Sequence, residues 1–170
     1  MLKAKHQGIL TVYLLSALLL LQACSNEQQS IEGLTNEAAP DFTVELFDGG
    51  AFKLSEQKGK AVMINFFASW CVSCGEEVHH IQEAFQSYAP EKVAFLGIAV
   101  DDTEKKATAF MKKNGLTIPA GLDRTGKLKE AFGLYGMPTT FFIDKNGIVS
   151  YFHAGVVTKE LITHEIDKLL

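Results

Sequence analysis

The sequence has 170 residues, of which 47% are hydrophobic and 21% are charged. This length suggests one domain with additional segments, and the apolar content is sufficient for a buried core. The formal net charge is −4 and no basic tract occurs, so nucleic acid is not expected as a partner, because phosphate binding requires clustered Lys and Arg.

The N-terminus has the pattern of a secretory signal peptide. Lys3 and Lys5 precede an almost wholly apolar run over residues 9–21, and the small residue Ala23 follows. This run of about 13 residues is shorter than the roughly 20 that a membrane-spanning helix requires. We therefore predict a cleaved signal peptide over residues 1–23. The alternative is an uncleaved membrane anchor.

Residues 21–24, Leu-Gln-Ala-Cys, resemble a bacterial lipobox. The resemblance implies cleavage before Cys24 and its lipidation, and two or more acyl chains would hold the protein stably on the periplasmic or cell-surface side of a bacterial membrane. The alternative, cleavage by the general signal peptidase, would leave a free thiol. Lipidation would leave Cys71 and Cys74 as one pair in a compartment where disulfides persist.

The charge of the exported form follows from the predicted cleavage. Loss of Lys3 and Lys5 lowers the count of Lys and Arg from 16 to 14 against 20 Asp and Glu, a net charge of −6. The next segment is mostly polar, and we predict a lipid-anchored flexible tether over residues 24–38. Pro40 marks the start of a folded domain that we predict over residues 39–170.

The first half of this domain contains four strand signals and one helix signal. Segments 42–46 and 51–54 flank Asp48-Gly49-Gly50 and predict a β-hairpin. Segments 61–67 and 93–100 are nearly continuous apolar runs, which are typical of strands buried on both faces. Helical spacing over residues 72–88 predicts a helix between them.

The second half continues this alternation of helices and strands. We predict helices over residues 103–113 and 125–132, strands over 139–143 and 148–153 joined by a turn, and a closing amphipathic helix over 158–170. The predicted fold class is therefore α/β, with a central mixed sheet flanked by helices and an N-terminal β-hairpin extension.

Cys71 and Cys74 directly follow a predicted buried strand and begin a helix. The helix N-terminus provides unpaired N–H groups and the positive end of the dipole, which stabilise a thiolate. Cys71, at the outer end, is the predicted nucleophile, and Cys74, one turn further in, would resolve the mixed disulfide. The alternatives are a structural disulfide, which stabilises little across so short a loop, and a zinc half-site completed by His79 and His80.

Helical periodicity separates the other polar side chains of this helix. His79 and His80 fall on the polar face, opposite the apolar stripe that contains Cys74. Glu77 lies one turn beyond Cys74, at the edge of the buried stripe. A partly buried carboxyl there would have a raised pKa and could exchange protons with Cys74. The alternative is a surface glutamate.

Four segments together resemble thioredoxin-like proteins of the membrane-tethered branch that supports cytochrome c maturation and related thiol reduction, the ResA and TlpA types. They are residues 39–42 (APDF), 66–74 (FFASWCVSC), 97–102 (GIAVDD) and 136–144 (GMPTTFFID). The resemblance covers roughly residues 39–170. It implies a thioredoxin-like fold and thiol–disulfide oxidoreductase activity through Cys71 and Cys74, with no bound cofactor and no metal.

The resemblance also implies roles for individual residues. Pro138 matches a cis-proline that packs against the disulfide and leaves the preceding backbone free to pair with a substrate strand, so Trp70, Met137 and Pro138 are the expected substrate-binding residues. Glu77 matches an acid that tunes the cysteines. Asn65 stands where thioredoxins proper have a buried Asp, and since Asn cannot titrate, proton handling would shift to Glu77.

Three residues depart from the family pattern. Ser73 replaces the proline that is common between the two cysteines, and His79 replaces the proline that often kinks this helix. Gly75 stands where a basic residue is usual. The dipeptide between the cysteines tunes the reduction potential, so the resemblance does not define the potential of this pair.

From these features we predict an extracytoplasmic enzyme that reduces disulfides in exported proteins, with apocytochrome c as the leading substrate. A membrane thiol–disulfide electron carrier would keep the cysteine pair reduced. The alternative is a copper-handling module on the same fold, with His153 as the distant ligand, although the relevant chaperones space their cysteines three residues apart. A peroxidase would be expected to have Thr where this chain has Ala68.

Overall fold

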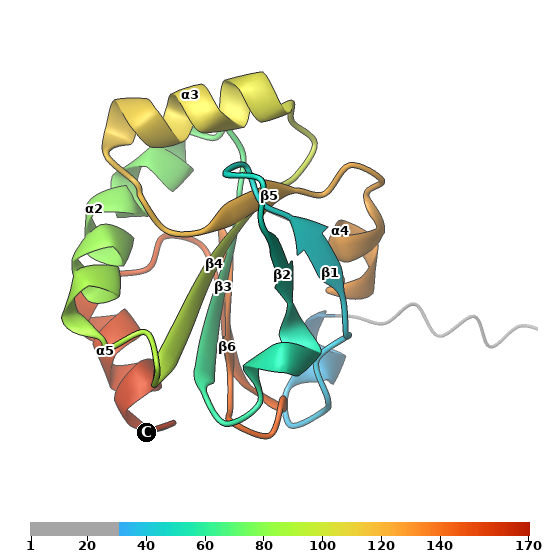
Figure 1. Ribbon diagram of the computed structural model, residues 1–170, viewed down its shortest axis with the longest axis vertical. Coiled ribbons are helices and arrows are strands. Elements are labelled where there is room, and N and C mark those ends of the chain that lie inside the picture. The colour runs from blue at the N-terminus through green and yellow to red at the C-terminus, as the bar shows by residue number, and fades with distance from the viewer. Residues whose placement is uncertain (1–30) are drawn as a thin grey trace, which may run out of the picture.

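The computed structural model describes residues 31–170, so the predicted signal peptide, the lipidation site Cys24 and the first part of the tether lie outside the described residues. A five-stranded sheet with the order β5-β4-β3-β6-β7 forms the centre, and β1 and β2 form a separate hairpin (Figure 1). The strands are β1 (Thr43–Glu45), β2 (Ala51–Lys53), β3 (Ala61–Phe67), β4 (Val93–Ala99), β5 (Ala120–Leu122), β6 (Thr139–Ile143) and β7 (Val149–Ala154).

The helices lie on both faces of this sheet. They are η1 (Ile31–Leu34), η2 (Leu54–Gln57), α2 (Val72–Ser87), α3 (Glu104–Asn114), α4 (Lys127–Ala131) and α5 (Lys159–Asp167). In Figure 1, α2, α3 and α5 lie on one side of the sheet, and the hairpin, α4 and η1 lie on the other. Each side has its own cluster of buried apolar side chains. No helix within residues 31–170 is long and apolar enough to cross a membrane.

Strand β3 occupies the middle of the sheet and leads to the cysteine pair. It pairs in parallel with β4 and antiparallel with β6, and all of its residues are buried. A strand covered on both faces requires apolar side chains almost throughout, which explains the continuous apolar run. The mixed sheet predicted from the sequence is confirmed, and so is the N-terminal hairpin.

Strand β5 was not predicted. It has only three residues, and its backbone pairs with the end of β4 and forms a bridge from Gly121 to Leu46 beside the hairpin. A Cβ at Gly121 would collide with the carbonyl oxygen of Glu45, so this close approach requires glycine. Neither the length nor the composition of the segment indicates a strand. Its extended pairing depends on β4 and Leu46, which lie beside it only in the folded domain.

The folded part of the chain begins earlier than the predicted boundary at Ala39. Leu34 is fully buried in the cluster beneath the hairpin. The Asn36 N–H donates to the Val149 carbonyl over 2.8 Å, and Ala38 forms an antiparallel bridge with Ile148. Residues 34–38 of the predicted tether therefore pack against the domain, because one apolar side chain and a short β-bridge fix a segment whose composition is otherwise polar.

Candidate active site

The two cysteines form a disulfide at the N-terminus of α2. Cys71 is the N-cap residue with extended backbone angles, and its sulfur accepts a hydrogen bond from the Cys74 N–H at 3.1 Å. The Cα atoms of the pair are 5.3 Å apart. Cys71 retains 7% exposure and Cys74 only 1%, so a partner molecule can approach the sulfur of Cys71 more readily than that of Cys74.

The loop before Cys71 is held by the loop that follows β4. The Ser69 N–H and hydroxyl donate to the two carboxylate oxygens of Asp102, at 2.6 and 3.0 Å. The Trp70 indole N–H donates to the Asp101 carbonyl at 3.0 Å, while 61% of the side chain remains exposed. Sequence reasoning did not identify this role of the two acids. The signal was available, since the carboxyl ends of adjacent parallel strands meet at one edge of a sheet.

Glu77 lies one turn after Cys74 and is buried, with 1% exposure. Its Oε1 accepts a hydrogen bond from Asn65 Nδ2 at 2.8 Å, and its Oε2 accepts one from the Val157 N–H at 2.9 Å. Burial raises its pKa from 4.5 to about 7, and the two hydrogen bonds oppose this rise by favouring the charged form. The burial predicted for Glu77 is confirmed, and a carboxyl with this pKa can gain or lose a proton near neutral pH.

Thr140 completes this buried polar cluster and was not identified from the sequence. The β3–β6 register places Thr140 opposite Asn65, and Asn65 Nδ2 also donates to the Thr140 hydroxyl at 3.0 Å. Asn65 therefore connects Glu77 on α2 with Thr140 on β6. A polar residue within a buried strand is the only signal that the sequence carries for such a contact.

The peptide bond between Met137 and Pro138 is cis, as the resemblance implied. Pro138 is buried and directly precedes β6, and the next residue, Thr139, pairs with Phe66 near the end of β3. The Pro138 carbonyl accepts a hydrogen bond from the Gly155 N–H at 2.9 Å. Met137 is partly buried and contacts the apolar clusters on both faces of the sheet. These two residues thus lie at the edge of the sheet from which the cysteine loop emerges.

The histidines considered as metal ligands lie apart from the cysteine pair. The rings of His79 and His80 on α2 contact each other at an interplanar angle of 44°, with centroids 3.7 Å apart, and His153 lies on β7 opposite Thr140. Across residues 31–170, no group of three or more His, Cys, Asp or Glu side chains is positioned to hold a metal ion.

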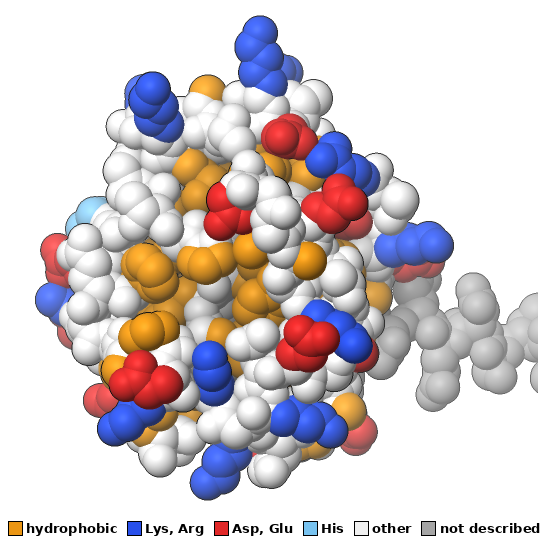
Figure 2. All heavy atoms as spheres, in the orientation of Figure 1, with side chains coloured by type: hydrophobic (Ala, Val, Ile, Leu, Met, Phe, Trp, Pro, Cys, Tyr) orange, Lys and Arg blue, Asp and Glu red, His pale blue; other side chains and the backbone are white. Residues whose placement is uncertain are grey.

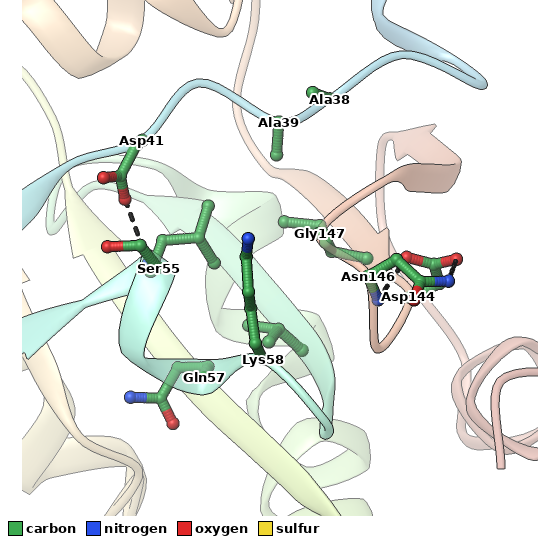
Figure 3. Close-up of a pocket in the computed structure, with 12 residues that line it drawn as sticks. Ala38, Ala39, Asp41, Ser55, Gln57, Lys58, Asp144, Asn146 and Gly147 are labelled. Atoms are coloured by element: carbon green, nitrogen blue, oxygen red, sulfur yellow. Dashed lines mark hydrogen bonds between the residues drawn. The ribbon is translucent and has the colours of Figure 1, made fainter.

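A cavity of about 280 Å³ lies at the opposite end of the sheet. Val62, at the start of β3, and Ile143, at the end of β6, contribute to its wall. Figure 3 shows Lys58 standing between Ser55 and Gly147 on its rim. The cysteine pair follows the other end of β3, so this cavity takes no part in the redox site.

Comparisons with known proteins agree with this geometry. A family profile described as the AhpC/TSA family matches residues 35–152. The chain is 34% identical over 131 residues to the thiol-disulfide oxidoreductase ResA of Geobacillus thermodenitrificans. This alignment covers 77% of this chain and 75% of the relative. It is 30% identical over 172 residues to the thioredoxin-like protein YneN of Bacillus subtilis, and this alignment covers 98% of this chain and 99% of the relative.

Solved structures show the same similarity. The crystal structure of a thiol:disulfide interchange protein of the thioredoxin family from Chlorobium tepidum superimposes with a TM-score of 0.71 at 32% identity, covering 78% of this chain and 94% of that one. The thioredoxin-like fold inferred from the sequence is therefore confirmed.

Proposed function

The chain belongs to the AhpC/TSA family and is a thiol–disulfide oxidoreductase; starting from this, we propose that it reduces disulfides in exported proteins, with apocytochrome c as the leading substrate. The observation that carries the proposal is the Cys71–Cys74 disulfide at a helix N-terminus, one turn from the buried carboxyl of Glu77. A dithiol at this position is a good nucleophile, and a carboxyl that titrates near neutral pH can serve it.

The proposed location is the outer side of a bacterial membrane. Residues 1–23 have the order of a signal peptide, and Cys24 directly follows a lipobox-like sequence. Lipid on Cys24 would hold the catalytic domain close to the membrane. A membrane thiol–disulfide carrier would return the Cys71–Cys74 disulfide to the dithiol at that place.

The reaction is a two-step thiol–disulfide exchange. The Cys71 thiolate attacks one sulfur of the substrate disulfide, which forms a mixed disulfide and releases the other substrate sulfur as a thiolate. The Cys74 thiolate then attacks the Cys71 sulfur, which closes the Cys71–Cys74 disulfide and releases the substrate as a dithiol. The protein is oxidised by two electrons and the substrate is reduced by two, and the two protons of the protein dithiol end on the substrate thiols.

Glu77 is the proposed proton carrier for the second step. Cys74 is almost fully buried, so solvent cannot readily take its proton. The Glu77 carboxyl lies one turn away on the same helix and has a pKa of about 7. It can therefore accept the Cys74 proton as the mixed disulfide is resolved and later release it.

Trp70, Met137 and Pro138 are the proposed substrate-binding residues. Trp70 is exposed and held in place by its hydrogen bond to Asp101. The backbone N–H and C=O of Met137 make no hydrogen bond within residues 31–170, and a substrate strand could pair with them by β-augmentation.

Substrate trapping tests the proposal. With Cys74→Ser in the full chain, the mixed disulfide on Cys71 should accumulate in the producing cell, and its partner should be an exported protein with a cysteine pair. Cys71→Ser is the matched control and should trap nothing. A redox titration completes the test: a Cys71–Cys74 potential as oxidising as that of the strongest disulfide formers, about −120 mV, would overturn the proposed direction of electron flow.

A further inference from the structure

A groove of about 550 Å³ opens directly beside the redox pair. The loop that contains Trp70 and Cys71 forms one wall together with Val72 and Gly75 on the first turn of α2, and one face of α3 forms the other. Since Cys71 itself lines this groove, a molecule bound there lies next to the reactive sulfur.

The middle of the groove is apolar and open. Val72 is 84% exposed and Trp70 is 61% exposed, and because both line the same groove they form one uncovered apolar surface there. Phe110 of α3 stacks on Phe67 with ring centroids 5.6 Å apart and forms part of the floor. A Cβ at Gly75 would lie 4.0 Å from the Phe110 ring, so the absence of a side chain at Gly75 keeps the groove open.

The α3 wall of the groove is basic. Lys106 and Lys113 both line it, and because they are seven residues apart they share one face of the helix, about 10 Å from each other. Within residues 31–170, no carboxylate lies within 4.0 Å of either ammonium group. Figure 2 shows basic side chains over α3 at the top of the molecule, although the chain as a whole has a net charge of −4.

The acids on the loop before α3 and in its first turn do not neutralise these lysines, because each has another partner. The Asp102 carboxylate accepts hydrogen bonds from Ser69 and from the Thr103 N–H. The two remaining acids form ion pairs elsewhere, Asp101 with Lys129 and Glu104 with Arg124. The positive charge of Lys106 and Lys113 is therefore available to a bound molecule.

We propose that this groove binds an extended acidic segment of the protein whose disulfide reacts with Cys71. An apolar side chain next to the reacting cysteine would pack between Trp70 and Phe110, and two carboxylates would pair with Lys106 and Lys113. An extended chain in the polyproline II conformation has three residues per turn and advances about 3.1 Å per residue, so acids three residues apart share one face, about 9 Å from each other, and match the spacing of the two lysines. The proposal rests on the proposed function, whose substrate class it specifies.

Peptides with one internal disulfide test this inference. Three versions carry Glu, Gln or Lys at two positions three residues apart, and the reduced full chain reduces each at low salt. We expect kcat/KM about tenfold higher for the Glu peptide than for the Gln peptide, the sum of two modest ion pairs, and lower for the Lys peptide. The preference should disappear in 0.5 M salt, because exposed charges are screened.

Two double variants on α3 distinguish the effect of charge within the groove from the effect of the net charge of the chain. Lys106→Glu with Lys113→Glu should abolish or reverse the preference for the acidic peptide. Lys105→Glu with Lys112→Glu changes the net charge by the same amount, but at exposed positions outside the groove. This double variant should therefore keep the preference for the acidic peptide. An equal loss in both double variants, or no preference in the unmodified chain, would overturn the proposal.

Two further measurements separate this inference from the proposed function. Bis(2-hydroxyethyl) disulfide is uncharged and too small to fill the groove, so its reduction reports the exchange reaction without groove binding, and the Lys105→Glu, Lys112→Glu double variant should reduce it at the unmodified rate. If no form of the chain reduces it, the proposed function fails. Binding of cysteine-free peptides to the oxidised chain can be measured by the fluorescence of Trp70, the single tryptophan. This measurement needs no redox reaction, so it decides whether the groove prefers acidic peptides even if the proposed function fails.

Discussion

Asn65 on β3 donates a hydrogen bond of 2.8 Å to Glu77 on α2, one turn from the buried cysteine. The contact connects the central strand with the redox helix, and it lies entirely within the core. It stabilises the charged form of Glu77 against the larger opposing effect of burial, which leaves the pKa of this carboxyl at about 7. Three predictions follow from this cluster, and two more concern the stability of other parts of the domain.

Glu77→Gln should slow disulfide reduction by about 100-fold at neutral pH, because a positioned proton carrier contributes at least this much. The rate of the reduced chain on a small disulfide, measured from pH 5 to 9, should also lose the inflection near pH 7. Glu76→Gln, on the exposed neighbouring residue, should leave both unchanged. If Glu77→Gln leaves the thiol pKa values and the rate unaltered, Glu77 has no role in proton transfer.

The raised pKa of Glu77 makes stability fall with increasing pH. Between the ordinary pKa of 4.5 and the folded value of about 7, the folded chain binds more protons than the unfolded chain. This contribution is fully present below pH 4.5 and is lost as the pH rises through 7, a change of about 3 kcal/mol. The free energy of unfolding in urea should therefore rise in Glu77→Gln, relative to the unmodified chain, by about that amount between pH 4.5 and pH 8. A constant difference would contradict the prediction.

Asn65→Leu should raise the pKa of Glu77 further, because it removes a donor that favours the carboxylate. The inflection in the pH–rate profile should move to higher pH. Thr140→Val removes the other acceptor of Asn65 but keeps the bond to Glu77, so it should move the inflection less. A shift to lower pH in Asn65→Leu would show that the hydrogen bond does not act on Glu77 in this way.

Leu34→Ala should destabilise the domain by about 2–5 kcal/mol, the usual effect of truncating a fully buried leucine. Chemical denaturation of the reduced and oxidised chains would measure the loss. Glu37→Ala, on an exposed side chain nearby, should change stability by less than about 0.5 kcal/mol. If Leu34→Ala is also neutral, residues 34–38 do not contribute to the folded domain.

Gly75→Ala should stabilise the domain by about 0.5–1 kcal/mol, because glycine is a poor residue within a helix. The site is helical, and the nearest atom to an added Cβ is 4.0 Å away. The same change at Gly115, which ends α3 with a φ of 72°, should instead be destabilising, since that backbone conformation disfavours a side chain. Thermal unfolding of the two variants should therefore shift in opposite directions.

Much of the site could be predicted from the sequence, because it depends on local pattern. The run from Ala61 to Phe67 predicted the central strand with its observed limits, and helical spacing after Cys71 placed Glu77 at the edge of the buried face. The roles of Pro138 and Asn65 came from the resemblance to a known family, since the sequence pattern alone does not distinguish a cis from a trans proline.

Tertiary structure decided the contacts between residues that lie far apart in the chain. Thr140 meets Asn65 only through the register of β3 and β6, and Lys106 and Cys71 line one groove only because α3 packs beside α2. The burial of Leu34 likewise depends on a surface that the rest of the domain provides. Periodicity determines which face of an element is apolar, whereas the pairing of elements depends on packing across the whole domain, and the groove beside the redox pair is a product of that packing.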